Sequence, residues 1–371
     1  MQNYKFNNKK IGFLGDTRTI QYESFVHLCK NAQVEVIPFQ ESYANNPQLL
    51  PRSKILRLIT SIKCLITGIT DKKYKMALRD YFKKNDIKCI IAYWGTVPFR
   101  DIISIKKINP DVKIILHVLC HPLGLTRMKV FLQNLYFRYG SKYLDGIIYT
   151  SNIMKNYFQD KVLKKNIPSI ISFPLLSKYF LPQKRKDKVF DHTPNLLFLG
   201  RMDWWAGQPT DNVLEPLENL IKAGIHIYHS DKTGDLPVSS FRHVFKPIIK
   251  LKEVIEFATQ FDASLIIYNL KKCKVQDRFK LTIPDRLITA VTAGIPVAIP
   301  RDGYDACKEF LKPYQAVIEF TSFTDLKEKL EAKESLTMLA NLAQENSRLF
   351  TAESQIDNLF AFIYPIIYKD G

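Results

Sequence analysis

The sequence predicts an α/β protein of two doubly wound domains, each built on a parallel sheet. Short, continuous apolar runs recur along the chain, as is typical of strands that are buried on both faces. Amphipathic segments separate these runs, which indicates crossover helices between parallel strands. The length of 371 residues favours two domains of ordinary size over one.

The first domain is predicted over residues 1–175. Its expected strands lie within 10–15, 34–39, 89–94, 113–119, 146–151 and 169–174. The segment 176–194, rich in Lys and Pro, then interrupts the pattern and is expected to be an interdomain linker.

The second domain is predicted over residues 195–345, where the same alternation restarts. Its expected strands lie within 195–200, 224–230, 263–269, 295–300 and 316–320, with helices near 212–223, 251–260 and 285–293. Residues 346–371 are expected to form helices that pack back across both domains. Open parallel sheets bind ligands beyond the carboxyl ends of their strands, so we expect a site in the cleft between the domains.

Composition limits the class of protein. No apolar run of about 18 residues occurs, and the start MQNYKFNNKK lacks the apolar core of a signal peptide, so a cytoplasmic protein is expected. Six scattered cysteines form no CxxC pair, which predicts reduced thiols and neither a zinc site nor disulfides.

The net charge of +18 is concentrated in one half of the chain. Residues 1–190 hold 33 Lys and Arg against 12 Asp and Glu, whereas residues 191–371 hold 21 against 24. A basic half can attract nucleic acid, an anionic membrane or a phosphorylated substrate.

The stretch IPDRLITAVTAGIPVAIP (283–300) predicts a short helix between a turn and a buried strand. Pro284 fits its first turn and Gly294 its end. Free amides at the helix start, beside Asp285 and Arg286, could bind phosphate. An ordinary capped helix explains the local pattern equally well.

Three motifs carry a family resemblance: NLLFLGRMDWW (195–205), the stretch 283–300, and TSFTDLKEKL (321–330). They resemble the nucleotide-sugar-binding domain of GT-B fold glycosyltransferases, especially family 4. AYWGTVPF, CHPLG and LDGIIYTSNIMKNYF in the basic half resemble, more loosely, the acceptor side of that family. The resemblance implies two Rossmann-like domains that face each other across a cleft and transfer a sugar from a nucleotide donor.

The resemblance also implies donor-binding residues. Gly200 and Arg201 match the family's Gly-Arg, whose guanidinium meets the donor diphosphate, and Arg286 matches its second basic residue. The paired glutamates of the family's E-x7-E pattern fall at Leu281 and Thr289, so the identity of the nucleotide stays open. A hydroxyl at Thr289 makes weaker hydrogen bonds than a carboxylate.

Other strand-end residues are candidates for the donor site. Asp203 and Trp204 follow the first strand of the second domain, where an aromatic face can stack on a base or sugar or simply pack between domains. Asn269 follows a later strand and is expected to touch the sugar.

In the first domain, the turn Gly15-Asp16-Thr17 follows the first strand and matches a loop that approaches donor phosphate or acceptor in the family; a plain turn is the alternative. His121 and Asp16 are competing candidates for a catalytic base. His117, inside a strand, is expected to be a packed core residue.

Two basic amphipathic segments, 51–69 and 126–143, suit the headgroup region of an anionic membrane. The second carries Phe131, Leu135 and Tyr139 on one face. The alternative is that these apolar stripes cover the sheet while the basic side chains are solvated.

The combined expectation is a glycosyltransferase with a glycan or lipid-linked acceptor, working in surface polysaccharide or glycoconjugate assembly at the cytoplasmic face of a membrane. No DxD motif is evident and arginines would meet the diphosphate, so neither a metal nor another cofactor is expected. A GT-B protein that binds without turnover is the alternative. A nucleic-acid-binding protein is a third, disfavoured by the lack of a recognisable module.

Overall fold

The chain forms two compact units, residues Met1–Pro174 with Gln355–Gly371 (unit 1) and Leu175–Ser354 (unit 2). The computed structural model describes residues 10–42, 59, 63, 67–69, 71–93, 99–123, 126–183, 193–200, 213–229, 243–245, 251–272 and 275–368. The sequence predicts boundaries at 175/176, 194/195 and 345/346.

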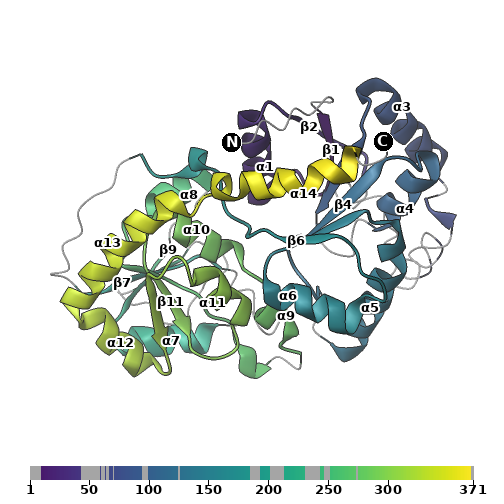
Figure 1. Ribbon diagram of the computed structural model, residues 1–371. Helices are drawn as coiled ribbons and strands as arrows, with labels where there is room; N and C mark the ends of the chain where they lie inside the picture. The colour runs from purple at the N-terminus through teal and green to yellow at the C-terminus, as the bar shows by residue number, and fades with distance from the viewer. Residues whose placement is uncertain are drawn as a thin grey trace. The chain divides into compact units, whose positions relative to one another are not determined.

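Unit 1 contains a parallel sheet with the strand order β2-β1-β3-β4-β5-β6 (Figure 1). Its strands are β1 (Lys10–Leu14), β2 (Glu35–Pro38), β3 (Cys89–Tyr93), β4 (Lys113–Val118), β5 (Gly146–Tyr149) and β6 (Ser169–Ile171). Its helices are α1 (Ile20–Asn31), α3 (Lys72–Asn85), α4 (Phe99–Ile108), α5 (Arg127–Gly140), α6 (Asn152–Tyr157) and α14 (Ile356–Tyr368).

Unit 2 contains a second parallel sheet, ordered β12-β11-β10-β7-β8-β9. Its strands are β7 (Asn195–Phe198), β8 (His226–His229), β9 (His243–Phe245), β10 (Ala263–Leu265), β11 (Val297–Pro300) and β12 (Val317–Phe320). Its helices are α7 (Leu214–Lys222), α8 (Leu251–Ala258), α9 (Asp277–Leu281), α10 (Asp285–Ala293), α11 (Asp305–Leu311), α12 (Phe323–Glu331) and α13 (Lys333–Leu349).

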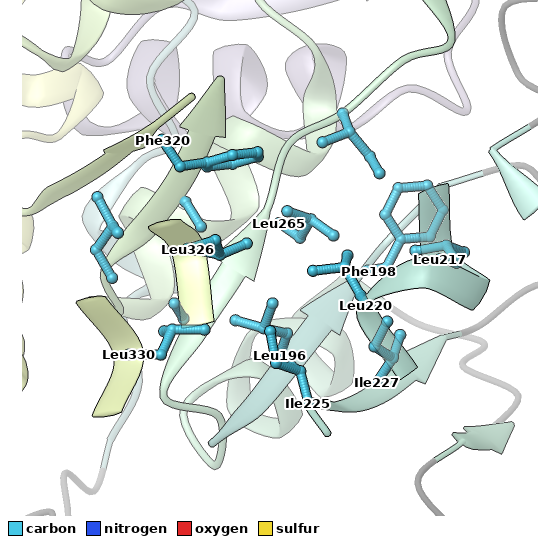
Figure 2. Close-up of a cluster of buried hydrophobic side chains, with 14 of the residues drawn as sticks. Leu196, Phe198, Leu217, Leu220, Ile225, Ile227, Leu265, Phe320, Leu326 and Leu330 are labelled. Carbon is cyan, nitrogen blue, oxygen red and sulfur yellow. The ribbon is translucent and has the colours of Figure 1, made fainter. Parts of the chain in front are cut away.

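Every strand predicted from an apolar run is present, and the α/β class with two parallel sheets is confirmed. In unit 2, Leu217 and Leu220 of α7 and Leu326 of α12 pack over Leu196 and Leu265 of the sheet (Figure 2). Strand residues that are buried on both faces need no polar alternation, which is why the runs are continuous.

Polar caps explain where many of the helices begin. The side chains of Thr19, Asp71, Thr126, Ser151 and Ser322 each accept a hydrogen bond from a backbone amide in the first turn of α1, α3, α5, α6 and α12, respectively. These caps satisfy amides that have no carbonyl partner within the helix.

The predicted linker and C-terminal helices divide between the units. Ser177 donates to Glu353 (Oγ to Oε1, 2.6 Å), and both residues belong to unit 2. In unit 1, helix α14 contacts β4 and β6, and Phe362 and Ile366 lie against Gly146 at the start of β5. The last helix is thus part of the first unit's packing.

The described cysteines, Cys29, Cys89, Cys120 and Cys307, are free and buried. In the described ranges no helix is both long and apolar enough to span a bilayer.

Candidate functional site

Helix α10 places Arg286 at the carboxyl end of the sheet in unit 2. The helix starts at Asp285 after Pro284, which has an extended backbone, and stops at Gly294 with φ of 69°. Only a residue without Cβ adopts that left-handed conformation readily, so the predicted stop is confirmed. Residues 287–293 are all buried, which fixes α10 rigidly against its neighbours.

The guanidinium of Arg286 is held by one hydrogen bond and two aromatic rings. Its Nη2 donates to the carbonyl of Ile267 at 2.8 Å, just beyond β10. Its Cζ lies 4.1 Å from the ring centroid of Tyr268 and 5.2 Å from that of Phe198. Cation and ring faces attract electrostatically, so the side chain is oriented before any ligand arrives.

Part of the hydrogen-bonding capacity of Arg286 is unused. Its Nε is buried and has no hydrogen-bond partner in the described part of the chain. A guanidinium carries five N–H donors, and a buried donor without a partner is costly. Such a fixed cation at strand ends is suited to binding an anion.

Gly200, after β7, provides the space that Arg286 occupies. A Cβ at this position would clash with Nη1 of Arg286 and would lie 2.6 Å from Cζ of Phe198. The structure therefore brings together Gly200 and Arg286, two of the residues that the family resemblance assigns to the donor site. Close approach requires glycine here, independently of any ligand.

Tyr268 was not among the residues expected from the sequence, which had favoured its neighbour Asn269. The ring of Tyr268 packs 4.5 Å from that of Phe279, centroid to centroid, and its amide donates to the hydroxyl of Tyr304 at 2.8 Å. Asn269 is buried, with 8% of its surface exposed. An aromatic residue at the end of the run ASLIIYN was the available signal for Tyr268.

Thr289, where the family has a glutamate, turns its hydroxyl to its own helix. The Oγ1 donates to the carbonyl of Asp285 at 3.0 Å, and the residue is 5% exposed. This is the common back-bond of a threonine within a helix. Because the hydroxyl proton of Thr289 is donated within the helix, it is not available to donate to a ligand.

We expect Thr289→Ala to change nucleotide-sugar affinity by less than about twofold, because the hydroxyl already has a helical partner. Thr292→Ala is a matched control, since its Oγ1 donates to the carbonyl of Ile288 in the same way at 2.9 Å. Calorimetric titration of both variants tests this. A tenfold loss of affinity in Thr289→Ala alone would show that Thr289 contacts the donor.

In unit 1, Asp16 is paired with Arg18 in the turn after β1. Nε and Nη2 of Arg18 donate to the two carboxylate oxygens at 2.9 and 2.8 Å. These hydrogen bonds hold the pKa of Asp16 below its usual value. A carboxylate with a lowered pKa is a weaker base, which counts against Asp16 as the catalytic base. Gly15 is buried and Thr17 is half-buried in the same turn.

His121 is enclosed by aromatic rings rather than presented to solvent. It is 1% exposed, its Nε2 lies 2.8 Å from Oδ1 of Asn134, and the ring of Phe158 is 4.7 Å away, centroid to centroid. A general base must reach the proton it removes. The catalytic role of His121 stays a prediction, and the enclosure of its ring counts against that role.

His117, near the end of β4, is a core residue as predicted. It is 9% exposed, with its ring 5.0 Å from that of Tyr93, centroid to centroid. Its Nε2 is buried and has no partner in the residues described. Burial lowers the pKa of His117 to about 3, so the ring is neutral.

Several predicted site residues lie outside the described residues: Arg201, Asp203 and Trp204, and most of the segment 51–69. Within the described ranges, no group of three or more His, Cys, Asp or Glu side chains is arranged to hold a metal ion.

Solved structures share this fold at low sequence identity. A sucrose-phosphate synthase from Thermosynechococcus elongatus superposes with a TM-score of 0.68 at 13% identity, covering 98% of this chain and 100% of that one. HepE of Anabaena, in complex with UDP and glucose, gives 0.60 at 10% identity over 96% and 99%. The lipopolysaccharide outer core galactosyltransferase WaaB gives 0.59 at 12% identity over 96% and 99%.

No protein-family model matches the sequence, and neither does any curated protein. The structural likeness extends over nearly the whole of each chain. The protein therefore has the GT-B fold, as the motifs in its sequence had indicated.

Proposed function

We propose that the protein is a glycosyltransferase that moves a sugar from a nucleotide-sugar donor to a glycan or lipid-linked acceptor. The observation that carries the proposal is the Arg286 guanidinium, held beside the rings of Phe198 and Tyr268 and against Gly200 at the carboxyl end of a parallel sheet. Ligands of such sheets bind at this end of the strands. A similar fold in HepE holds UDP and glucose, which supports a nucleotide-sugar donor.

In the proposed reaction, Arg286 stabilises the charge that develops on the leaving nucleoside diphosphate. Preorganised cations lower the barrier for such a departure because they need no rearrangement during the reaction. Arg201 would contribute a second cation. The protein would then need no metal ion, and we expect turnover to persist in EDTA.

The acceptor is proposed from charge and from one structural likeness. The excess of Lys and Arg in residues 1–190 favours an acceptor at an anionic membrane surface, on the cytoplasmic side. WaaB, of similar fold, is a lipopolysaccharide galactosyltransferase, which supports a role in surface glycoconjugate assembly.

A thermal-shift screen over UDP-, GDP-, dTDP- and CMP-sugars tests donor binding. A ligand that binds only the folded protein raises its stability by an amount that grows with affinity. We expect one nucleotide class to raise the unfolding temperature, and donor hydrolysis to follow with the matching sugar. No shift with any of the four classes would contradict the proposal.

The second candidate is a GT-B protein that binds a nucleotide sugar without turnover. It is favoured by Thr289, whose hydroxyl bonds its own helix where the family has a carboxylate. Donor hydrolysis separates the candidates, because this one predicts a thermal shift with no release of nucleoside diphosphate.

A further inference from the structure

We propose that the outer face of α5 docks the protein onto an anionic lipid bilayer. The outer face is the set of exposed apolar side chains Met128, Phe131, Leu132, Leu135 and Tyr139. The inference rests on the proposed function in one respect: a membrane surface is where a lipid-linked acceptor would be found.

Helix α5 has two apolar faces, and its inner face already accounts for its packing within unit 1. Val130, Phe137 and Gly140 are buried. The ring of Phe137 lies 5.0 Å from that of Phe99 and 4.6 Å from that of Phe158, centroid to centroid. The sheet and its neighbouring helices thus need nothing from the outer face.

The outer face is open to solvent. Met128 is 66% exposed, Phe131 58%, Leu132 44%, Leu135 41% and Tyr139 39%. At about 100° per residue, these positions fall within an arc about 100° wide, opposite the buried residues. The interpretation that this stripe covers the sheet is therefore wrong for Phe131, Leu135 and Tyr139. A contiguous exposed apolar stripe of this kind marks an interaction surface.

Basic side chains border the outer face. Arg127 and Lys129 are exposed on its two sides near the start of α5, and Nζ of Lys142 lies 4.0 Å above the ring centroid of Tyr139 near its end. No Asp or Glu occurs between positions 112 and 144. The exposed Asp160, in the segment that follows α6, is accompanied by exposed Lys161, Lys164 and Lys165.

This combination fits a bilayer better than a protein partner. Apolar side chains flanked by cations are the features with which a helix lies in the headgroup region of anionic lipids. Helix α13 offers a contrast: it also exposes Met338 and Leu349, but its exposed Lys333 and Arg348 are matched by the exposed Glu334 and Glu345. An apolar surface whose charges balance has no excess of cations for anionic headgroups, so α13 supplies a control surface.

The test is co-sedimentation of the full chain with phosphatidylcholine vesicles that contain or lack phosphatidylglycerol. We expect binding only to the anionic vesicles, weakened by salt because screening shortens the reach of the charges. The double variant Phe131→Ser/Leu135→Ser should reduce binding at least about tenfold, and so should Arg127→Glu/Lys129→Glu. Met338→Ser/Leu349→Ser should bind as the unchanged protein does.

Three results would overturn the docking proposal: no binding of the unchanged protein to anionic vesicles, unchanged binding in both α5 variants, or a dimer that becomes a monomer in Phe131→Ser/Leu135→Ser. Light scattering during size exclusion reports the last of these. Nucleotide-sugar binding and unfolding temperature, measured on the same samples, confirm that each variant is folded. Because nucleotide-sugar binding concerns unit 2 and vesicle binding concerns α5 in unit 1, failure of one proposal is distinguishable from failure of the other.

Discussion

Arg286→Ala is expected to weaken nucleotide-sugar binding about 10- to 100-fold. Hydrogen bonds to a charged group contribute about 1.5–3 kcal/mol, and about 1.4 kcal/mol corresponds to a factor of ten in affinity. Arg286→Lys should recover only part of the loss, because an ammonium keeps the charge but lacks the planar fork that Phe198 and Tyr268 hold in place. Isothermal titration calorimetry with the nucleotide sugar found in the thermal screen measures both variants.

The control for charge is Arg348→Ala, an exposed arginine near the end of α13, which should bind the donor as the unchanged protein does. Arg286→Ala is also expected to destabilise the protein, because it leaves the carbonyl of Ile267 without the donor that lies 2.8 Å away. Urea unfolding should show a stability loss on the order of 1–3 kcal/mol. Unaltered affinity in a folded Arg286→Ala protein would remove Arg286 from the donor site.

Gly200→Ala tests the same packing of Arg286 against Gly200 and Phe198 without removing a charge. Its methyl group would clash with Nη1 of Arg286 and would lie 2.6 Å from Cζ of Phe198, so both side chains must move. The loss of affinity should approach that of Arg286→Ala. If Gly200→Ala binds normally, the position of the guanidinium is not what the donor requires.

The pairing of Gly200 with Arg286 could be anticipated from the sequence, because the motifs fix which strand end and which helix start they occupy. The order of apolar runs gave the strands for a similar reason: a strand buried on both faces leaves a continuous apolar signal. The aromatic support from Tyr268 was not anticipated. Pattern alone does not tell whether a ring after a strand packs inward or covers a neighbouring side chain.

His121 and α5 both show that a sequence pattern does not determine whether a side chain is buried or exposed. A histidine in a strand-end loop was expected to face a substrate, and the fold encloses it beside Phe158 and Asn134. The stripe on α5 fitted either the sheet or a membrane, because periodicity identifies a face without identifying what covers it. Exposure of Phe131 and Leu135 decides against the sheet, and it does so only through three-dimensional packing.

His117 is expected to make the stability of the protein depend on pH. Burial lowers its folded-state pKa to about 3 from an ordinary value of 6.5. Between these values the unfolded chain binds a proton that the folded chain excludes, so acid favours unfolding. The stability that the buried, neutral His117 contributes is fully present above about pH 6.5. It declines as the pH falls and stops changing below about pH 3.

His117→Phe should remove this dependence, since phenylalanine fills a similar volume beside Tyr93 and does not titrate. From about pH 7.5 to about pH 5, the free energy of unfolding should fall on the order of 2 kcal/mol further in the unchanged protein than in the variant. Urea unfolding at both pH values measures the difference, and the comparison near pH 7.5 reports any packing cost separately. Parallel pH profiles for the two proteins would mean that His117 takes up a proton in the folded state as readily as in the unfolded chain, and hence that its burial does not exclude the charged ring.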